Sequence, residues 1–84
     1  MLEILKQAIA FYGADNQKRQ LLEEMAELAF AVCKSMRGED HNVPEELADV
    51  KIMIAQMELI YCCKADVDRF EAQKLKRLAE RTGL

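Results

Sequence analysis

Breaks in the helical periodicity constrain the fold of this chain more than any other feature. The 84 residues include a single proline and three glycines, and the long stretches between them carry apolar residues at helical spacing. Gly13 suits the end of one helix, and Pro44 suits the first turn of another. We therefore predict an all-α chain of four helices without strands. The predicted helices run from about Leu2 to Tyr12, from a cap at Asp15 or Asn16 to Met36, from Pro44 to Cys63, and from a cap at Asp66 to just before Gly83.

The predicted helices carry more apolar side chain than one small domain can bury. Hydrophobic residues make up 51% of the chain, and a chain this short buries only a modest fraction of its surface. The third helix is apolar nearly all round from Leu47 to Cys63, so it needs neighbours on more than one side. We therefore predict one domain over residues 1–84 with a four-helix-bundle-like fold that assembles as a homodimer or homotetramer.

Charge and composition exclude several classes of protein. The net charge of −3 argues against a nucleic-acid partner, because phosphate contacts require a basic surface. No apolar run reaches transmembrane length, and the first residues do not resemble a signal peptide, so we expect a cytoplasmic protein without a membrane partner. The odd cysteine count (Cys33, Cys62, Cys63) favours buried thiols over disulfides or a zinc site.

Two acidic motifs suggest a metal site. Glu24 and Glu27 are three residues apart in one predicted helix, and Glu46 and Asp49 are three apart in the next. Side chains at this spacing are neighbours on a helix, about 5–6 Å apart at Cβ. Two such pairs on facing helices would bring four carboxylates together, where they repel each other unless some take up protons. Mg²⁺ or Mn²⁺ would remove this repulsion, because both prefer oxygen ligands.

The helical register of the third helix favours a functional role for its acids. Glu46 and Asp49 share a face with Met53, Met57 and Ile60, so that face is expected to point into protein. Two carboxylates directed inward need a partner, and few basic residues are placed to supply one. Either motif alone is more often a solvated surface or a helix start, but the two together favour a site.

The second helix gives a weaker signal. Its acids, Glu23, Glu24 and Glu27, lie on the other side of the helix from the apolar stripe that we predict to face the core, with Glu24 close to the edge of that stripe. By itself this is an ordinary solvated face. The predicted core stripe consists of Leu21, Leu22, Met25, Leu28, Ala29, Val32 and Met36.

The doubled motif resembles the signature of the MazG-like all-α nucleoside triphosphate pyrophosphohydrolases, a group that includes the dimeric dUTPases. Glu-Glu-x-x-Glu on one helix is followed by Glu-x-x-Asp on the next, and the run Glu-Leu-Ala-Asp-Val at 46–50 is especially typical. The resemblance covers most of the chain, including a closing basic helix. By position it implies that Mg²⁺ is held by Glu24, Glu27, Glu46 and Asp49, and that Glu23 is an additional acid that holds a water or supports the ligands.

The resemblance also implies an activity, the hydrolysis of a nucleoside triphosphate between its α- and β-phosphates. An acid not fully engaged with metal would take the proton of the attacking water, and Glu23 and Glu24 are the candidates. Lys74 and Arg81 on the fourth helix are candidate ligands of the phosphates. Lys51 and Arg77 are weaker candidates for the same role. The chain is short for this family and has no obvious segment for recognising the base.

Two other classes of protein compete with this interpretation. A di-iron carboxylate bundle would use Glu-x-x-His pairs, but the single histidine, His41, falls in the predicted loop and is expected at the surface. The remaining alternative is a non-catalytic helical interaction or regulatory module that self-associates through its third helix. Binding of a divalent metal would distinguish the enzyme from this module.

Overall fold

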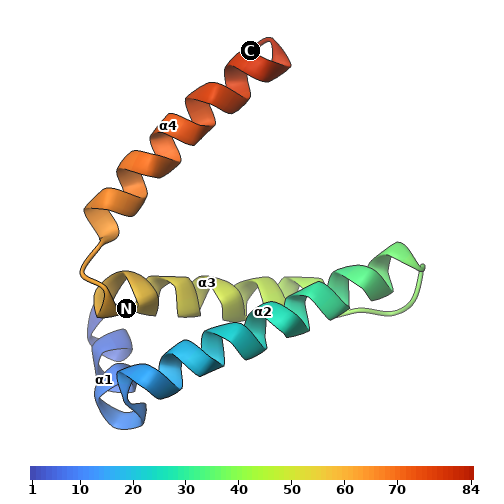
Figure 1. Cartoon of the computed structure of the whole chain (residues 1–84). Helices are drawn as coiled ribbons and strands as arrows, with labels where there is room; N and C mark the ends of the chain where they lie inside the picture. Colours follow the sequence, from blue (N-terminus) through green and yellow to red (C-terminus); the bar gives the residue numbers. More distant parts are fainter.

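The fold contains four α-helices and no strands, as predicted (Figure 1). A computed structural model describes all residues from Met1 to Leu84. Gly13 separates the first two helices with φ of 89°, a conformation that glycine adopts without steric cost. The helices in chain order are α1 (Leu2–Tyr12), α2 (Ala14–Met36), α3 (Val43–Ile60) and α4 (Lys64–Thr82).

The predicted side-chain caps are wrong, although the helix boundaries are close. Gly13 occupies the N-cap position of α2 and Cys63 that of α4, and neither position makes a side-chain cap hydrogen bond. Asp15, Asn16 and Asp66 lie inside the first turns instead. The two carboxylates still complement the positive end of each helix dipole there.

The α2 and α3 helices form an antiparallel hairpin, and α1 packs across its open end (Figure 1). At that end Lys18 of α2 places its Nζ atom 4.7 Å from the centre of the Tyr61 ring, just beyond α3. The small apolar core lies among these three helices. Its buried residues are Leu5, Ala31, Val50 and Met53.

The face of α2 that packs against α3 differs from the predicted stripe. Gln17 and Ala31 are buried and Glu24 and Leu28 are half-buried, so the side carrying Glu24 faces α3. Most of the stripe predicted as core is exposed. The exposed fractions are 65% for Leu22, 50% for Met25, 40% for Val32 and 82% for Met36. The face of α2 that meets α3 is more polar than the predicted stripe, so hydrophobic periodicity alone does not identify it.

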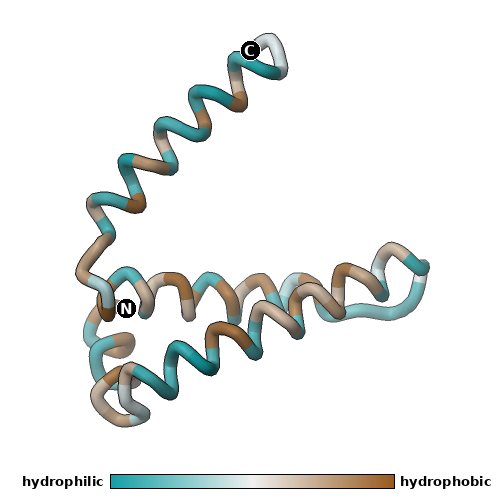
Figure 2. Tube along the Cα trace, in the orientation of Figure 1, coloured by the Kyte–Doolittle hydropathy of each residue, from teal (hydrophilic) through white to brown (hydrophobic).

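The inward register predicted for α3 is confirmed. Glu46, Val50 and Met53 are all buried on the side that faces α2. Large apolar side chains on the two flanks of the helix are less well covered, and Ile52 and Ile54 are 50% and 47% exposed. Hydrophobic residues recur along α3 (Figure 2), and in a single chain the helix leaves some of their side chains uncovered.

The α4 helix extends away from the other three and contains no buried residue (Figure 1). It packs only against α3, so a single chain lacks the four-helix packing that we predicted. The radius of gyration is 15.6 Å, whereas a compact domain of this length has one of roughly 12 Å. The chain is thus extended, because α4 contacts only α3 and projects away from the other helices (Figure 1).

The prediction of buried cysteines is wrong for a single chain. Cys33 and Cys62 are exposed and Cys63 is half-buried. Cys33 lies near the end of α2, and the other two lie where α3 gives way to α4.

Candidate carboxylate site

Three of the predicted ligands converge between α2 and α3. One carboxylate oxygen from each of Glu24, Glu46 and Asp49 lies within 4.8 Å of the other two. Glu24 comes from the middle of α2, and Glu46 and Asp49 come from the first turns of α3. The antiparallel hairpin therefore brings the two acidic motifs face to face, and we call these three residues the carboxylate cluster.

The carboxylate cluster is incompletely hydrogen-bonded. Gln20 Nε2 donates to Glu24 Oε1 at 2.7 Å, and Asn42 Nδ2 donates to Glu46 Oε1 at 2.8 Å. The second oxygens, Glu24 Oε2 and Glu46 Oε2, are buried without a hydrogen-bond partner. Glu46 is only 7% exposed. Burying a carboxylate oxygen without a hydrogen-bond partner is strongly disfavoured, and a bound cation or a proton would relieve this cost.

Glu27 adds a fourth negative charge at the edge of the cluster. Its pKa is raised above the ordinary value of 4.5, first because the Glu24 carboxylate repels its ionised form, with desolvation and the charge of Glu46 adding to the effect. Two ionised carboxylates can only accept hydrogen bonds. A proton on Glu27 would let it donate to Glu24 or Glu46, which is a second way to relieve the repulsion.

We expect this repulsion to make the metal-free protein lose stability as the pH rises. A carboxyl with a raised pKa in the folded state favours folding below its unfolded value, near 4.5 for Glu27, and that contribution disappears as the pH rises through the folded value. Denaturant unfolding in EDTA from acidic to neutral pH should show the wild type losing stability relative to Glu27→Gln. Parallel stability curves for the two proteins would contradict this expectation.

The remaining predicted site residues lie outside the carboxylate cluster. Glu23 is exposed and lines a polar pocket beside it. Lys51 is exposed on α3 next to Ala48 and Ile52, in an apolar hollow that includes no acid. The bases of α4 are also exposed, and α4 does not contact α2. These are Lys74, Arg77 and Arg81.

The residues present fit a hard divalent cation. Glu24, Glu46 and Asp49 supply oxygen donors from two directions, and two of those oxygens lack any other partner. Carboxylate oxygens suit Mg²⁺ and Mn²⁺, whereas no sulfur or imidazole ligand lies in this group. Glu27, close enough to interact with Glu24 and Glu46, is placed to serve as a further ligand.

Sequence reasoning missed the amide side chains around the site. Gln20 and Asn42 each precede by four residues the glutamate to which they donate, a spacing that places them on the same helix face. Gln17 and Gln56 are both buried, at 7% and 4% exposure. Gln56 could have been noticed, because it interrupts an otherwise apolar part of the inward face of α3.

None of the helices combines the length and the apolar character needed to cross a membrane. Comparison of the chain with protein-family models, with curated proteins and with solved structures gives no match.

Proposed function

We propose that this protein is a MazG-like pyrophosphohydrolase, which uses Mg²⁺ or Mn²⁺ to hydrolyse a nucleoside triphosphate to the monophosphate and pyrophosphate. The observation that carries the proposal is the convergence of Glu24, Glu46 and Asp49 around two buried carboxylate oxygens that lack partners. A purely structural cluster would be expected to pair these oxygens with a base or with backbone N–H groups.

The residues of the site divide into two roles in this proposal. The carboxylate cluster, with Glu27 at its edge, holds the cation. Glu23 is exposed beside the cluster, whereas both oxygens of Glu24 are buried or hydrogen-bonded. Glu23 is therefore the better placed of the two candidate bases to take a proton from water. When bound, Mg²⁺ would neutralise charge on the phosphates and lower the pKa of a coordinated water.

The bond that breaks lies between the α-phosphorus and the oxygen that bridges it to the β-phosphate. Water adds to phosphorus, its proton goes to the general base, and pyrophosphate leaves with the bridging oxygen. The substrate brings several negative charges to a site that already holds carboxylates, so cations from the metal or from basic side chains must balance them. The site is therefore expected to bind substrate poorly without metal.

The products give a direct test of the reaction. Incubation with a panel of nucleoside triphosphates and Mg²⁺ should release equal amounts of nucleoside monophosphate and pyrophosphate, with no activity in EDTA. Chromatography of the nucleotides and a pyrophosphate assay measure the two products separately. Release of orthophosphate and nucleoside diphosphate would mean attack at the γ-phosphorus, and the proposed family assignment would then be wrong.

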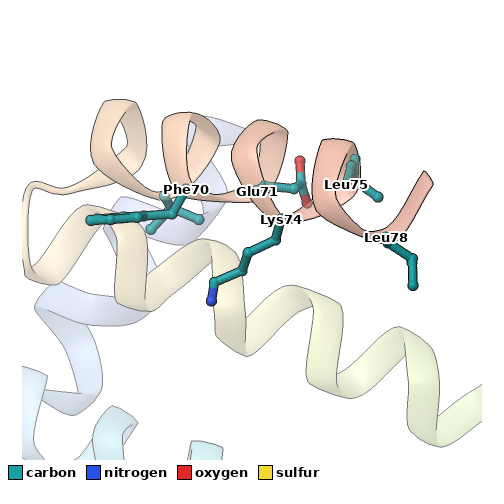
Figure 3. Close-up of a pocket in the computed structure, with 6 residues that line it drawn as sticks. Phe70, Glu71, Lys74, Leu75 and Leu78 are labelled. Carbon is teal, nitrogen blue, oxygen red and sulfur yellow. The ribbon is translucent and has the colours of Figure 1, made fainter. Parts of the chain in front are cut away.

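The proposed enzyme also includes a second copy of the chain, as a dimer or tetramer. Only 7 of the 84 residues are buried in a single chain, and large apolar side chains are exposed on every helix. On α4 the side chains of Phe70, Lys74 and Leu78 extend from one side of the helix into an open, mostly apolar hollow (Figure 3). Patches of this extent normally mark surfaces that another protein covers.

We expect light scattering at micromolar concentration to report a dimer or a larger assembly. Phe70→Ser should weaken that assembly, because Phe70 is 51% exposed in the single chain and central to the apolar side of α4. Gln73→Ser is a matched control on the same helix, since Gln73 is exposed and lies outside the hollow. A well-folded wild-type monomer would contradict the proposed assembly.

The exposed apolar side of α4 also favours the alternative function, a non-catalytic helical module that acts by self-association. Such a module would need the assembly but not the unpartnered oxygens of Glu24 and Glu46. An oligomer that neither binds Mg²⁺ nor hydrolyses any nucleoside triphosphate would favour this alternative.

A further inference from the structure

The joint between α3 and α4 carries two adjacent thiols, Cys62 and Cys63, which we call the thiol pair. Cys62 is exposed and Cys63 is half-buried. The third cysteine, Cys33, lies near the end of α2, at the opposite end of the antiparallel hairpin (Figure 1). Within one chain the two thiols of the pair therefore have only each other as a sulfur neighbour.

The end of α3 gives no structural reason for a cysteine at position 62. The Cys62 N–H donates to the Leu59 carbonyl oxygen at 3.2 Å, and the Cys63 N–H donates to the Glu58 carbonyl oxygen at 3.1 Å. In this type of helix end the residue at position 62 is left-handed and is usually glycine. Cys62 has φ of 52° and is the only residue other than glycine with a positive φ. Glycine would adopt this conformation without steric cost.

The start of α4 gives no structural reason for a cysteine at position 63 either. Cys63 occupies the N-cap of α4, where serine, threonine, aspartate and asparagine are favoured because a side-chain oxygen can accept a backbone N–H. The Cys63 side chain makes no such bond. Free cysteines are usually buried as small apolar side chains, and this pair is not. Neither capping nor packing therefore accounts for two thiols at the joint.

An exposed thiol beside a second thiol is the arrangement found in cysteines that respond to oxidants. We propose that the thiol pair is a reversible oxidation site, at which a hydroperoxide converts Cys62 and Cys63 into a disulfide that changes the direction of α4. Exposed Cys62 is the thiol that meets the oxidant, and half-buried Cys63 is the thiol that resolves the product. The proposal depends neither on the carboxylate cluster nor on the proposed hydrolysis.

The reaction has two steps when the oxidant is hydrogen peroxide. The Cys62 sulfur, as the thiolate, attacks one peroxide oxygen, the O–O bond breaks, and water leaves with the thiol proton, so that Cys62 becomes a sulfenic acid. The Cys63 sulfur then attacks the Cys62 sulfur, and the S–O bond breaks as the S–S bond forms. The leaving hydroxyl takes the Cys63 proton and departs as a second water. Two electrons have passed from the two sulfurs to the peroxide oxygens.

The position of the two cysteines favours a disulfide that is easily reduced again. Adjacent residues have their Cα atoms about 3.8 Å apart across a trans peptide, whereas disulfides usually join Cα atoms about 4.4–6.8 Å apart. A disulfide between Cys62 and Cys63 is therefore strained, and strained disulfides are the labile ones that cellular thiols reduce. A strained bond suits a reversible signal better than a structural link.

Closing this disulfide should redirect α4, because the two cysteines form the connection between α3 and α4. Relief of the strain requires new backbone angles at Cys62 and Cys63, where α3 ends and α4 begins. No other contact would hold α4 in its present direction, since α4 has no buried residue and contacts only α3 (Figure 1). The oxidation state of the pair would thus set where the apolar side of α4 points.

Peroxide treatment of the full-length Cys33→Ser protein tests the pair without interference from the remaining thiol. We expect both thiols to disappear together in a titration with a thiol reagent, and the intact mass to fall by that of two hydrogen atoms. A non-reducing gel should show no interchain disulfide. Dithiothreitol should restore both thiols, because the strained disulfide is readily reduced.

Single substitutions in the same Cys33→Ser background assign the two steps. Cys63→Ser should stop at the sulfenic acid of Cys62, which dimedone traps, and should then proceed to a sulfinic acid that dithiothreitol does not reverse. Cys62→Ser should react more slowly, because Cys63 is half-buried. Interchain disulfides in place of the intrachain product would overturn the proposal. Sulfinic acid formation in the Cys33→Ser protein as readily as in Cys63→Ser would also overturn it.

Small-angle X-ray scattering tests the effect on α4. The oxidised and reduced forms of the Cys33→Ser protein should give different scattering curves, because α4 points in a different direction in each. Cys62→Ser in the same background is the matched control, and its curve should be the same before and after peroxide treatment, since it cannot form the disulfide. Disulfide formation that leaves the scattering curve unchanged would overturn the proposed effect on α4.

Discussion

Asp49→Asn is expected to reduce hydrolysis of nucleoside triphosphates by at least about 100-fold, since disturbing even the outer partners of a metal costs 10–100-fold. Asparagine has nearly the same shape as aspartate and keeps the helix. It removes the negative charge of one of the three carboxylates whose oxygens lie within 4.8 Å of one another. The loss should appear in kcat/KM at fixed Mg²⁺, while circular dichroism and the state of assembly stay unchanged.

Asp40→Asn is the matched control for this experiment. Asp40 is exposed in the loop between α2 and α3 and is not part of the carboxylate cluster. The same chemical change there should leave activity within about twofold of wild type, because exposed substitutions away from a site have small effects. If Asp49→Asn retains activity comparable to Asp40→Asn, Asp49 is not a metal ligand.

Magnesium is expected to raise the melting temperature of the wild type by roughly 10–20 °C at a hundredfold excess over its dissociation constant. A ligand that binds only the folded state stabilises it by about 2.7 kcal/mol at that excess, and each kcal/mol shifts the midpoint of a domain this small by about 4–8 °C. Glu46→Gln should remove most of this gain, because Glu46 contributes a buried oxygen without a partner.

Glu46→Gln should also make the metal-free protein more stable. Its glutamine can still accept the hydrogen bond from Asn42, while the repulsion among the carboxylates is reduced. Glu45→Gln, one residue earlier and exposed, is the control and should respond to Mg²⁺ like wild type. Equal thermal shifts in wild type and Glu46→Gln would place the metal elsewhere.

Much of the hairpin that carries the site could be predicted from the sequence. Gly13 and Pro44 mark helix ends through their own backbone preferences, which do not depend on tertiary packing. Glu46 and Asp49 could be predicted to point inward, because the rest of their helix face, including Met53, is apolar. A helical wheel identifies the buried face of a helix where only one orientation of that helix buries its apolar residues.

Other features could not be predicted from the sequence, for reasons of packing. The wheel of α2 favours its most apolar stripe, yet Leu22 of that stripe is 65% exposed and the face that meets α3 carries Gln17 and Glu24. The position of α4 is determined by its contact with α3 alone, which leaves Phe70 51% exposed. Gln56 was overlooked because a single amide in an apolar helix acquires meaning only beside Gln17 and a cavity.

The polar seam between α2 and α3 affects how strongly the helices of this protein are held together. In an ordinary helical hairpin the facing positions at three- and four-residue intervals are mainly apolar, and they hold the two helices together. Here Gln17, Glu24, Glu46, Asp49 and Gln56 occupy much of that seam, and large apolar side chains are found on the outer faces instead. Polar groups at such positions fix one alignment of the helices at the expense of stability. The small apolar core leaves the hairpin dependent on the proposed assembly to cover its outer apolar side chains, so its free energy of unfolding is expected to increase with protein concentration.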